Sequence, residues 1–268
     1  MSDELSQYVF IYIKSFLLGI IQGLTEFIPI SSSAHLKVFP YIFGWSDPGV
    51  SLSASLQLGS SLAVIYYFRD DITLMIHTLS TIFSRRKFFK DDNTILLGYI
   101  FIANIPILFF GLLIKVFWQN FSESNYRGLF SIAIISILSA LLLALAEILG
   151  KRKKMFSDVN LKDIIFIGVS QSLAIFPGVS RSGITISSAL ISGWERRDAA
   201  KFSFLLGMPA ISLAAIVEFI SSFNDFFSLG FLPLFIGLVT TFLSSLLAID
   251  FLLKYFSTNG LKIFIIYR

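Results

Sequence analysis

Long runs of apolar residues constrain the fold of this chain more than any other feature. A helix needs about 20 mostly apolar residues to cross the hydrocarbon core of a bilayer, and four runs satisfy this: Ile95–Phe117, Gly128–Leu149, Ala199–Ser222 and Phe231–Leu253. A further candidate is Ser51–Phe68, and two more apolar segments, Tyr8–Ile28 and Leu161–Phe176, run into Pro and Ser clusters. The sequence therefore predicts an all-α integral membrane protein, folded as a polytopic helical bundle.

The composition supports lipid as the solvent of this fold. Charged residues make up 14% of the chain, against about 25% in typical soluble domains. No linker or low-complexity stretch interrupts the sequence, so we expect a single domain over residues 1–268, with repeat halves of about 1–150 and 151–268. The chain has no Cys, which excludes disulfides, thiolate chemistry and Cys-ligated metals.

The formal charge of +4 has a membrane explanation. The basic residues gather in two short loops, residues 85–90 and Lys151–Lys154, and short Lys/Arg-rich loops mark the cytoplasmic side. Two predicted spans separate these loops, so both lie on one side and the connector Trp118–Arg127 faces outward. Nucleic-acid binding is disfavoured because no basic stripe extends over a soluble face.

Two segments resemble each other at a constant offset. The first begins at Gly19 and continues to Ser33, and the second begins at Gly168 and continues to Ser182. The identical pairs are Gly19 and Gly168, Gln22 and Gln171, Leu24 and Leu173, Phe27 and Phe176, Ser31 and Ser180, and Ser33 and Ser182. Paired, Pro/Gly-interrupted segments in the two halves of a membrane protein indicate a binding site at the repeat interface. We therefore expect two re-entrant helical hairpins, Gly23–Phe43 and Phe176–Gly193, to meet near the centre of the bundle.

The first segment carries a carboxylate, hydroxyl groups and an imidazole. Gln22 and Glu26 share one helix face because they are four residues apart, and Pro29 ends this helix. An ionisable group inside an apolar run, such as Glu26, indicates a functional site. The serines 31–33 can cap the next helix, and His35 follows within about one turn of Ser32.

The second segment suits an anion. Pro177-Gly178 breaks a helix, and Ser180-Arg181-Ser182-Gly183 then begins another. A helix N-terminus attracts phosphate, and a guanidinium matches phosphate oxygens in a bidentate manner. Carboxylate, hydroxyl or imidazole, and guanidinium together are the parts needed for phosphoryl transfer.

The motifs QGLTEFIPISSSAHL and PGVSRSGITIS resemble the two signature motifs of the undecaprenyl-diphosphate phosphatase family, the bacitracin-resistance phosphatases. The stretches ASLQLGSSLAV around Gln57 and AAKFSFLLGMPA around Phe202 extend the resemblance over nearly the whole chain. The resemblance implies hydrolysis of undecaprenyl diphosphate to the monophosphate, with a divalent cation (Mg²⁺ or Ca²⁺), at the outer face of the bacterial plasma membrane. It also implies recycling of the lipid carrier for cell-wall synthesis and resistance to bacitracin.

The same resemblance assigns roles to individual residues. It places the family's carboxylate motif on Gln22 and Glu26, which become candidate metal ligands, its serine on Ser32 and its histidine on His35. The catalytic candidates are Glu26, Ser32, His35 and Arg181, and the candidates for phosphate binding are Ser31, Ser33, Gln171, Ser180, Ser182, Gly183 and Thr185. Ser32 is the favoured nucleophile, with His35 or a metal-activated water as alternatives.

Three departures from the family pattern accompany these assignments. Gln22 stands where relatives often have Glu, Ala34 stands where they usually have Gly, and relatives continue beyond Ile-Tyr-Arg268 into an apolar helix. Two other interpretations stay open at this stage. Glu26 could be a structural carboxylate paired with Arg181, and the broken-helix repeat could serve a transporter or flippase of a phosphorylated lipid or anion. The partners expected are a polyprenyl diphosphate lipid and the bilayer, and the sequence leaves open whether the protein is a homo-oligomer.

Overall fold

The computed structural model describes residues 2–46, 49–85, 92–118, 128–221 and 230–268, and these residues are mainly helical. The longer helices are α1 (Ser2–Phe27), α3 (Gly49–Tyr67), α4 (Arg69–Arg85), α5 (Asp92–Phe117), α6 (Leu129–Leu149), α9 (Arg196–Ser221) and α11 (Phe231–Tyr255). The shorter ones are α2 (Ser32–Ile42), η3 (Phe156–Asp158), α7 (Leu161–Gln171), η4 (Ser172–Ile175), α8 (Arg181–Ile191) and α12 (Lys262–Tyr267). Residues 86–90 of the first basic loop and residues 119–127 of the predicted outward connector lie outside the described residues.

The four principal predicted spans are confirmed as long apolar helices. Candidate membrane spans in the described part of the chain are Val9–Phe27, Thr94–Ile114, Leu129–Leu149, Arg196–Val217 and Phe231–Tyr255. The apolar segment Leu161–Phe176 instead forms the 11-residue α7 followed by a 3₁₀ turn. Because a span needs about 20 residues, α7 is too short to cross the bilayer, and the protein is a multi-pass membrane protein through its longer helices.

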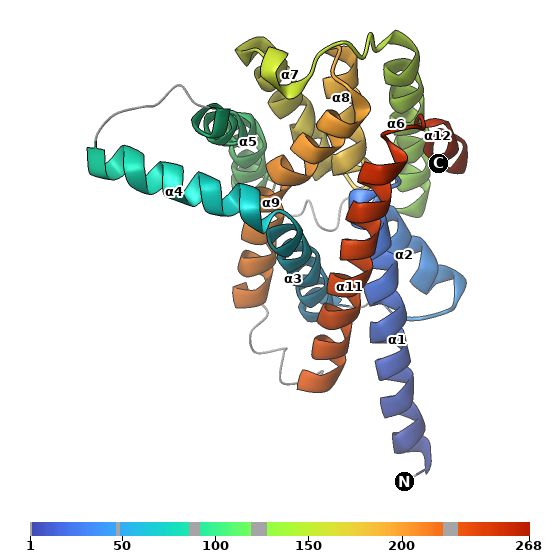
Figure 1. The fold of residues 1–268 in the computed structure, drawn as a ribbon. Coiled ribbons are helices and arrows are strands. Elements are labelled where there is room, and N and C mark those ends of the chain that lie inside the picture. Colours follow the sequence, from blue (N-terminus) through green and yellow to red (C-terminus); the bar gives the residue numbers. More distant parts are fainter. Residues whose placement is uncertain (1, 47–48, 86–91, 119–127, 222–229) are drawn as a thin grey trace.

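The long helix α4 was not predicted from the sequence. It begins at the cluster Arg69-Asp70-Asp71, directly after α3. Acidic residues in the first turn of a helix interact favourably with its dipole, and Asp71 also forms an ion pair with Lys201 of α9 at 2.8 Å. Figure 1 shows α4 extending away from the rest of the bundle.

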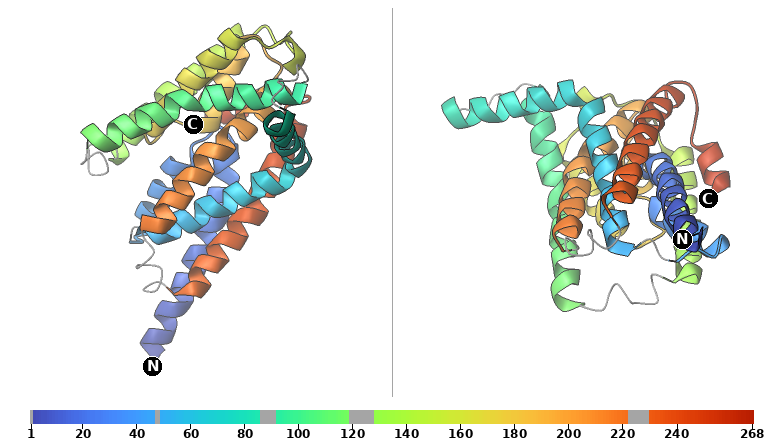
Figure 2. Two further views of the ribbon diagram at one scale, coloured as in Figure 1. Left: turned by 90° about the vertical axis from the view of Figure 1, so that its left-hand side faces the viewer. Right: turned by 90° about the horizontal axis from the view of Figure 1, so that it is seen from below.

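Helices α1, α11, α3 and α9 lie side by side, as Figure 2 shows. Small residues permit this close packing: a Cβ at Gly19 would lie 2.8 Å from the Gly237 carbonyl oxygen, and one at Gly59 would lie 2.6 Å from that of Leu238. Close helix contacts at Gly are typical of membrane proteins, where packing rather than water exclusion holds helices together. Helix α11 therefore lies between α1 and α3.

The second half repeats this use of glycine. A Cβ at Gly168 of α7 would lie 2.7 Å from the carbonyl oxygen of Ala103 in α5. Gly19 and Gly168 are matched positions of the internal repeat, and both lie where another helix approaches closely. The repeat is thus reflected in the packing of α1 on α11 and of α7 on α5.

A common core joins the two halves of the chain. Its buried members extend from Phe27 to Phe264 and include Trp194, Phe202 and Phe204. The halves therefore pack on each other through apolar side chains, while the single-domain organisation stays a prediction. Helices α2 and α8, with 11 residues each, are short enough to be re-entrant, but their entry and exit on one side of the membrane also stays a prediction.

Candidate active site

The first of two turns at the site connects α1 to α2. As predicted, α1 ends just before Pro29, at Phe27, and α2 begins at Ser32. Ser31 precedes α2 with φ of 76°, a left-handed conformation that is uncommon for a residue other than Gly. Its side chain does not cap α2, contrary to the expectation that this serine run caps the helix. Instead, the Ser31 and Ser33 hydroxyl oxygens are 3.1 Å apart.

Three side chains from the two helices that this turn joins form one polar chain. Glu26 Oε2 accepts hydrogen bonds from Ser32 Oγ at 2.6 Å and from Gln22 Nε2 at 3.0 Å. The predicted shared face of Gln22 and Glu26 is therefore confirmed. Because the carboxylate accepts directly from the Ser32 hydroxyl, it is in position to remove that proton.

The second turn connects η4 to α8. Gly178 adopts φ of 96°, which suits a residue without a Cβ, and a Cβ there would also lie 2.9 Å from the Ile132 carbonyl oxygen of α6. Ser180 caps α8 by accepting a hydrogen bond from the Gly183 N–H at 3.1 Å. The Ser-Arg-Ser motif thus begins a helix as predicted, and the N-terminus of that helix attracts anions.

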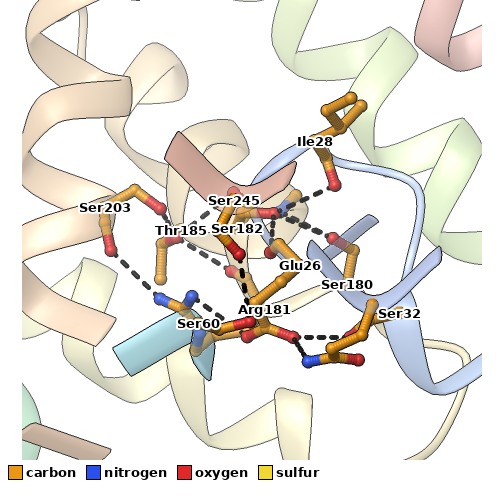
Figure 3. A network of polar contacts seen from close by, with 12 residues as sticks. Glu26, Ile28, Ser32, Ser60, Ser180, Arg181, Ser182, Thr185, Ser203 and Ser245 are labelled. Atoms are coloured by element: carbon orange, nitrogen blue, oxygen red, sulfur yellow. Dashed lines mark hydrogen bonds and ion pairs between the residues drawn. The ribbon is translucent and has the colours of Figure 1, made fainter. Parts of the chain in front are cut away.

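The two turns contact each other directly. Arg181 Nη2 and Glu26 Oε1 are 3.4 Å apart, with both side chains about nine-tenths buried. The Gly178 N–H donates to Ser33 Oγ at 3.3 Å, and Ser182 Oγ donates to the Glu26 carbonyl oxygen at 3.4 Å. Figure 3 shows Glu26 between Ser32 on one side and Arg181 on the other. The expectation that the repeated segments converge is confirmed.

A cavity of about 220 Å³ opens at this junction. It is lined by Glu26, Ser31, Ser32, Ser33, Gln57, Ile107, Ala174, Ile175, Val179, Ser180, Arg181, Ala210, Ile211 and Ala214. The polar groups come from the two turns and from Gln57 of α3, while α5 and α9 supply apolar walls. Both α2 and α8 begin at this cavity, so two helix N-termini contribute positive potential there.

A socket on α9 holds the Arg181 guanidinium. Arg181 Nη1 donates to the Ser203 carbonyl oxygen at 3.1 Å, and the Thr185 and Ser203 hydroxyl oxygens are 2.6 Å apart. A Cβ at Gly207 would overlap the guanidinium. Gly207 therefore leaves the space that lets this charged group lie inside the bundle, facing Glu26.

His35 does not line the cavity. Its Nδ1 is 2.7 Å from the Ser31 carbonyl oxygen, which can only accept, so Nδ1 carries the proton. In the neutral ring Nε2 then accepts from the Tyr267 hydroxyl at 2.8 Å, and the two rings stack nearly parallel. Nδ1 thus binds the backbone at Ser31, and Nε2 fixes the ring against Tyr267.

Arg268, beside Tyr267, connects the two turns. Its guanidinium donates to the Pro29 carbonyl oxygen at 3.3 Å and to the Gly178 carbonyl oxygen at 2.7 Å. One side chain therefore bridges the first turn and the second. Together with the contact between Tyr267 and His35, these bonds hold the C-terminal end of α12 against both turns.

The structure brings some of the predicted site residues to the cavity and leaves others away from it. Those that line the cavity are Glu26, Ser31, Ser32, Ser33, Ser180 and Arg181. Gln22, His35, Ser182, Gly183 and Thr185 support these residues from behind through the contacts described above. Gln171 does not line the cavity; it is buried, and its Nε2 is 3.5 Å from Asn104 Oδ1.

Sequence reasoning assigned no role to five residues at the site: Gln57, Ser203, Gly207, Tyr267 and Arg268. The first three lie in the stretches around Gln57 and Phe202 that extend the family resemblance, so a signal existed but indicated no chemistry. Tyr267 and Arg268 follow a short apolar run and carry no motif of their own. Only the folded chain brings them to the site.

Two oxygen donors at the site, from Glu26 and Gln22, are of the kind that a divalent cation binds. Among the described residues no group of three or more His, Cys, Asp or Glu side chains could hold a metal ion by itself. However, Gln22 Oε1 is buried and has no hydrogen-bond partner among those residues, and it neighbours the Glu26 carboxylate. Mg²⁺ commonly binds one or two carboxylates together with substrate phosphates, which matches one carboxylate, one amide oxygen and a bound diphosphate.

The fold and the site together define a multi-pass helical membrane protein with a buried polar site that is built from two repeated turns. The chain belongs to the bacitracin resistance protein BacA family, whose model matches residues 15–268. An undecaprenyl-diphosphatase of Prochlorococcus marinus strain NATL1A is 59% identical over 268 residues, covering 100% of this chain and 96% of the relative. Another, from strain MIT 9301, is 61% identical over 257 residues, covering 96% of this chain and 95% of the relative.

Proposed function

We propose that this protein hydrolyses undecaprenyl diphosphate to undecaprenyl phosphate and inorganic phosphate. One observation carries the proposal: a hydrogen-bonded carboxylate–serine pair, Glu26 and Ser32, faces a guanidinium, Arg181, in one cavity. Family membership and relatives named undecaprenyl-diphosphatase support the choice of substrate. The cavity also favours a catalytic Glu26 over a purely structural one, because a packing ion pair needs no open space beside it.

Ser32 is the nucleophile in this proposal. Glu26 takes the Ser32 proton as Oγ bonds to the terminal phosphorus, and the bond from that phosphorus to the bridging oxygen breaks, releasing undecaprenyl phosphate. Water then attacks the phosphoserine, and inorganic phosphate leaves while Ser32 recovers its proton. The separation of 2.6 Å between Ser32 Oγ and Glu26 Oε2 supports direct proton transfer.

Arg181 and the helix N-termini stabilise the charge that this reaction develops. A guanidinium matches two phosphate oxygens, and donors that are fixed before the reaction act strongly where water is excluded. The Ser203 carbonyl and the space at Gly207 keep Arg181 in place. When substrate enters, its phosphate oxygens would compete with Glu26 for the guanidinium, freeing the carboxylate to act as a base.

His35 acts as a positioning residue in this proposal rather than as the nucleophile. Both of its ring nitrogens are engaged, by the Ser31 carbonyl and by Tyr267, and the ring lies outside the cavity. Through Ser31 it fixes the left-handed backbone that precedes Ser32. A His35 substitution would therefore lower activity by displacing Ser32.

We further propose that a divalent cation assists the reaction. Glu26 and Gln22, whose Oε1 has no hydrogen-bond partner in the described part of the chain, are the residues that would hold it together with the diphosphate. Its charge would offset that of the phosphates. Hard oxygen donors favour Mg²⁺ or Ca²⁺. Gln22 stands where relatives often have Glu, and its amide would supply a neutral oxygen donor in place of a carboxylate.

The bacterial plasma membrane, with the site toward its outer side, is the proposed location. The basic residues Lys151–Lys154 follow the C-terminal end of α6 and mark the cytoplasmic side. The second turn contacts α6 near its other end, at Ile132 and Ser136. Because α6 rises about 1.5 Å per residue, these contacts lie nearer its outer end than its cytoplasmic end. They therefore support a site in the outer half of the bilayer.

Phosphate release by the purified chain in detergent tests the proposed function. Wild-type protein should release inorganic phosphate from undecaprenyl diphosphate, whereas Ser32→Ala should lose nearly all activity and the exposed Ser257→Ala should keep it. Detergent micelles have no second compartment, so release there separates hydrolysis from transport. No phosphate release by well-folded wild-type protein, with or without divalent cation, would refute hydrolysis.

The covalent intermediate tests the nucleophile separately. Rapid quenching with substrate labelled in its terminal phosphate should leave acid-stable label on Ser32. Acid-labile label that disappears in His35→Asn would assign the attack to histidine. Full activity in Ser32→Ala would favour attack by water.

A further inference from the structure

An apolar groove lies next to the catalytic cavity, on the flank of α6. Its lining residues are Ser131, Ile134 and Ile135 of α6 and Phe176 and Val179 of the second turn, and its volume is about 420 Å³. Four of these five side chains are apolar, and Ile134 is 43% exposed at the groove. Figure 1 shows α6 beside α8, the helix that the second turn begins.

Packing of the second turn on α6 forms the groove. The absent side chain of Gly178 allows the turn to approach α6, since a Cβ would lie 2.9 Å from the Ile132 carbonyl oxygen and 3.1 Å from Ile135 Cγ2. Ser136 Oγ also donates to the Gly178 carbonyl oxygen, at 3.5 Å. The groove is therefore fixed relative to Ser180 and Arg181, which follow in the chain.

The groove and the cavity share Val179, which lines both. Arg181 is only two residues farther along, a distance that an extended chain covers in about 7 Å. An apolar surface thus continues directly into a site that carries a guanidinium. This juxtaposition fits a molecule whose anionic head is bonded to an apolar chain.

We propose that this groove binds the first isoprene units of the substrate, those nearest the diphosphate; this rests on the proposed hydrolysis of a prenyl diphosphate. The bilayer is as apolar as the groove, so the groove gains little by removing the chain from lipid. Its effect is orientation instead. With the chain at Val179, the phosphate bonded to the prenyl group lies toward Ser180 and Arg181, and the terminal phosphate lies toward Glu26 and Ser32.

This orientation explains which bond breaks. The groove places the terminal phosphorus, rather than the one bonded to the prenyl chain, at the Ser32 hydroxyl, so the bond that breaks joins the terminal phosphorus to the bridging oxygen and Ser32 receives the terminal phosphoryl group. Holding reacting atoms in one geometry is a large source of rate. The groove residues are therefore specificity-determining rather than catalytic.

Filling the groove with Ile134→Trp tests the proposal. The kcat/KM for undecaprenyl diphosphate should fall at least fivefold, because the chain no longer orients the head group. The inhibition constant of inorganic pyrophosphate, which has no chain, should change by less than twofold. Leu138→Trp is the matched control, since Leu138 lies one turn farther along α6, is 56% exposed and is outside the groove. That control should behave as wild type for both ligands.

The smaller substitution Ile134→Phe tests the same proposal if Ile134→Trp fails to fold. Elution from a size-exclusion column shows whether each variant is folded. Ile134→Phe should also lower kcat/KM for undecaprenyl diphosphate, by about half as much on a logarithmic scale. An unchanged kcat/KM in a well-folded groove variant would overturn the proposal and leave hydrolysis intact. Equal effects of Ile134→Trp and Leu138→Trp would also overturn it, because they would show that any lipid-facing Trp on α6 acts alike. Inactive wild-type protein would instead indicate failure of the proposed function.

Discussion

The two repeated turns have similar frameworks and opposite chemistry. At the constant offset of the repeat, Ser32 corresponds to Arg181, and each is the first residue of an 11-residue helix that begins at the cavity. In the first turn this position is a hydroxyl that donates to Glu26, and in the second it is a guanidinium that faces the same carboxylate. The repeat thus supplies two similar scaffolds, and the difference at this one position gives the first a hydroxyl and the second a guanidinium.

The backbones of the two turns differ as well. The second uses Gly178 for its left-handed residue and Ser180 as a helix cap. The first places the left-handed conformation on Ser31, without a side-chain cap, and holds it through His35. A non-Gly residue in this region costs about 1–3 kcal/mol, and such strain concentrates at functional sites. The strained turn is the one that carries the proposed nucleophile.

The largest effect is expected from Arg181, which supplies the positive charge of the second turn. Arg181→Ala should lower kcat/KM by about a hundredfold to a thousandfold, as loss of a preorganised donor to a developing charge does. Arg181→Lys should recover part of this loss, because it keeps the charge but not the fork of donors. Exposed Arg197 on the same helix as the socket provides the control Arg197→Ala. Phosphate-release kinetics measure all three, and an Arg181→Ala variant within twofold of wild type would refute the role.

Gly207→Ala should have the next largest effect on activity, because the added methyl group would displace the Arg181 guanidinium. We expect kcat/KM to fall at least tenfold, or about 1.4 kcal/mol in the barrier. Gly111→Ala on α5 is the matched control, since nothing lies within 4 Å of a Cβ there. It should keep wild-type activity, because Ala also favours a helix over Gly by up to about 1 kcal/mol. Equal activities of the two variants would contradict the socket.

Tyr267→Phe and Arg268→Gln test how the two turns are held together. Each removes hydrogen bonds worth about 1 kcal/mol, so we expect kcat to fall by roughly fivefold with little change in the Michaelis constant. Tyr267→Phe keeps the ring that stacks on His35, and should lose no further activity when combined with His35→Asn. Fully multiplicative losses in that double variant would show that Tyr267 does not act through His35.

Stability comparisons should show the smallest effects. Ser180→Ala removes a helix cap and should reduce the free energy of unfolding by about 1 kcal/mol. Ser31→Gly relieves the left-handed strain but adds backbone freedom to the unfolded chain, so we expect a change within about 1 kcal/mol. Unfolding by SDS in mixed micelles measures both. A larger loss in Ser31→Gly than in Ser180→Ala would mean that the Ser31 side chain, rather than the backbone, stabilises the first turn.

Much of the fold was predictable because apolar runs of span length leave few alternatives to a helix in lipid. Helix α4 was missed, since the charges at Arg69–Asp71 resemble the end of a span as much as the start of a new helix. The convergence of Glu26 with Arg181 was predictable from the internal repeat. The contacts of Arg181 with Ser203 and the space at Gly207 were not, because a backbone carbonyl and an absent side chain leave no chemical signal in a sequence.

His35 shows a different limit of sequence reasoning. Its place one turn after Ser32 suggested a shared site, and the two residues are indeed neighbours, but the ring turns toward Tyr267, distant in sequence. The spacing of two residues along a helix indicates that they are close together, but it does not indicate the direction in which a side chain points. Arg268 likewise reaches Pro29 and Gly178 through tertiary packing alone.

A double-mutant cycle on kcat/KM for undecaprenyl diphosphate, with Glu26→Gln, Arg181→Gln and the two combined, tests most directly whether the two turns form one catalytic site. Residues that act together on one transition state lose activity non-additively. We predict that each single variant loses at least a hundredfold and that the double variant is no worse than about threefold below the poorer single one. Multiplicative losses, or a single variant that retains wild-type activity while folded, would contradict the account.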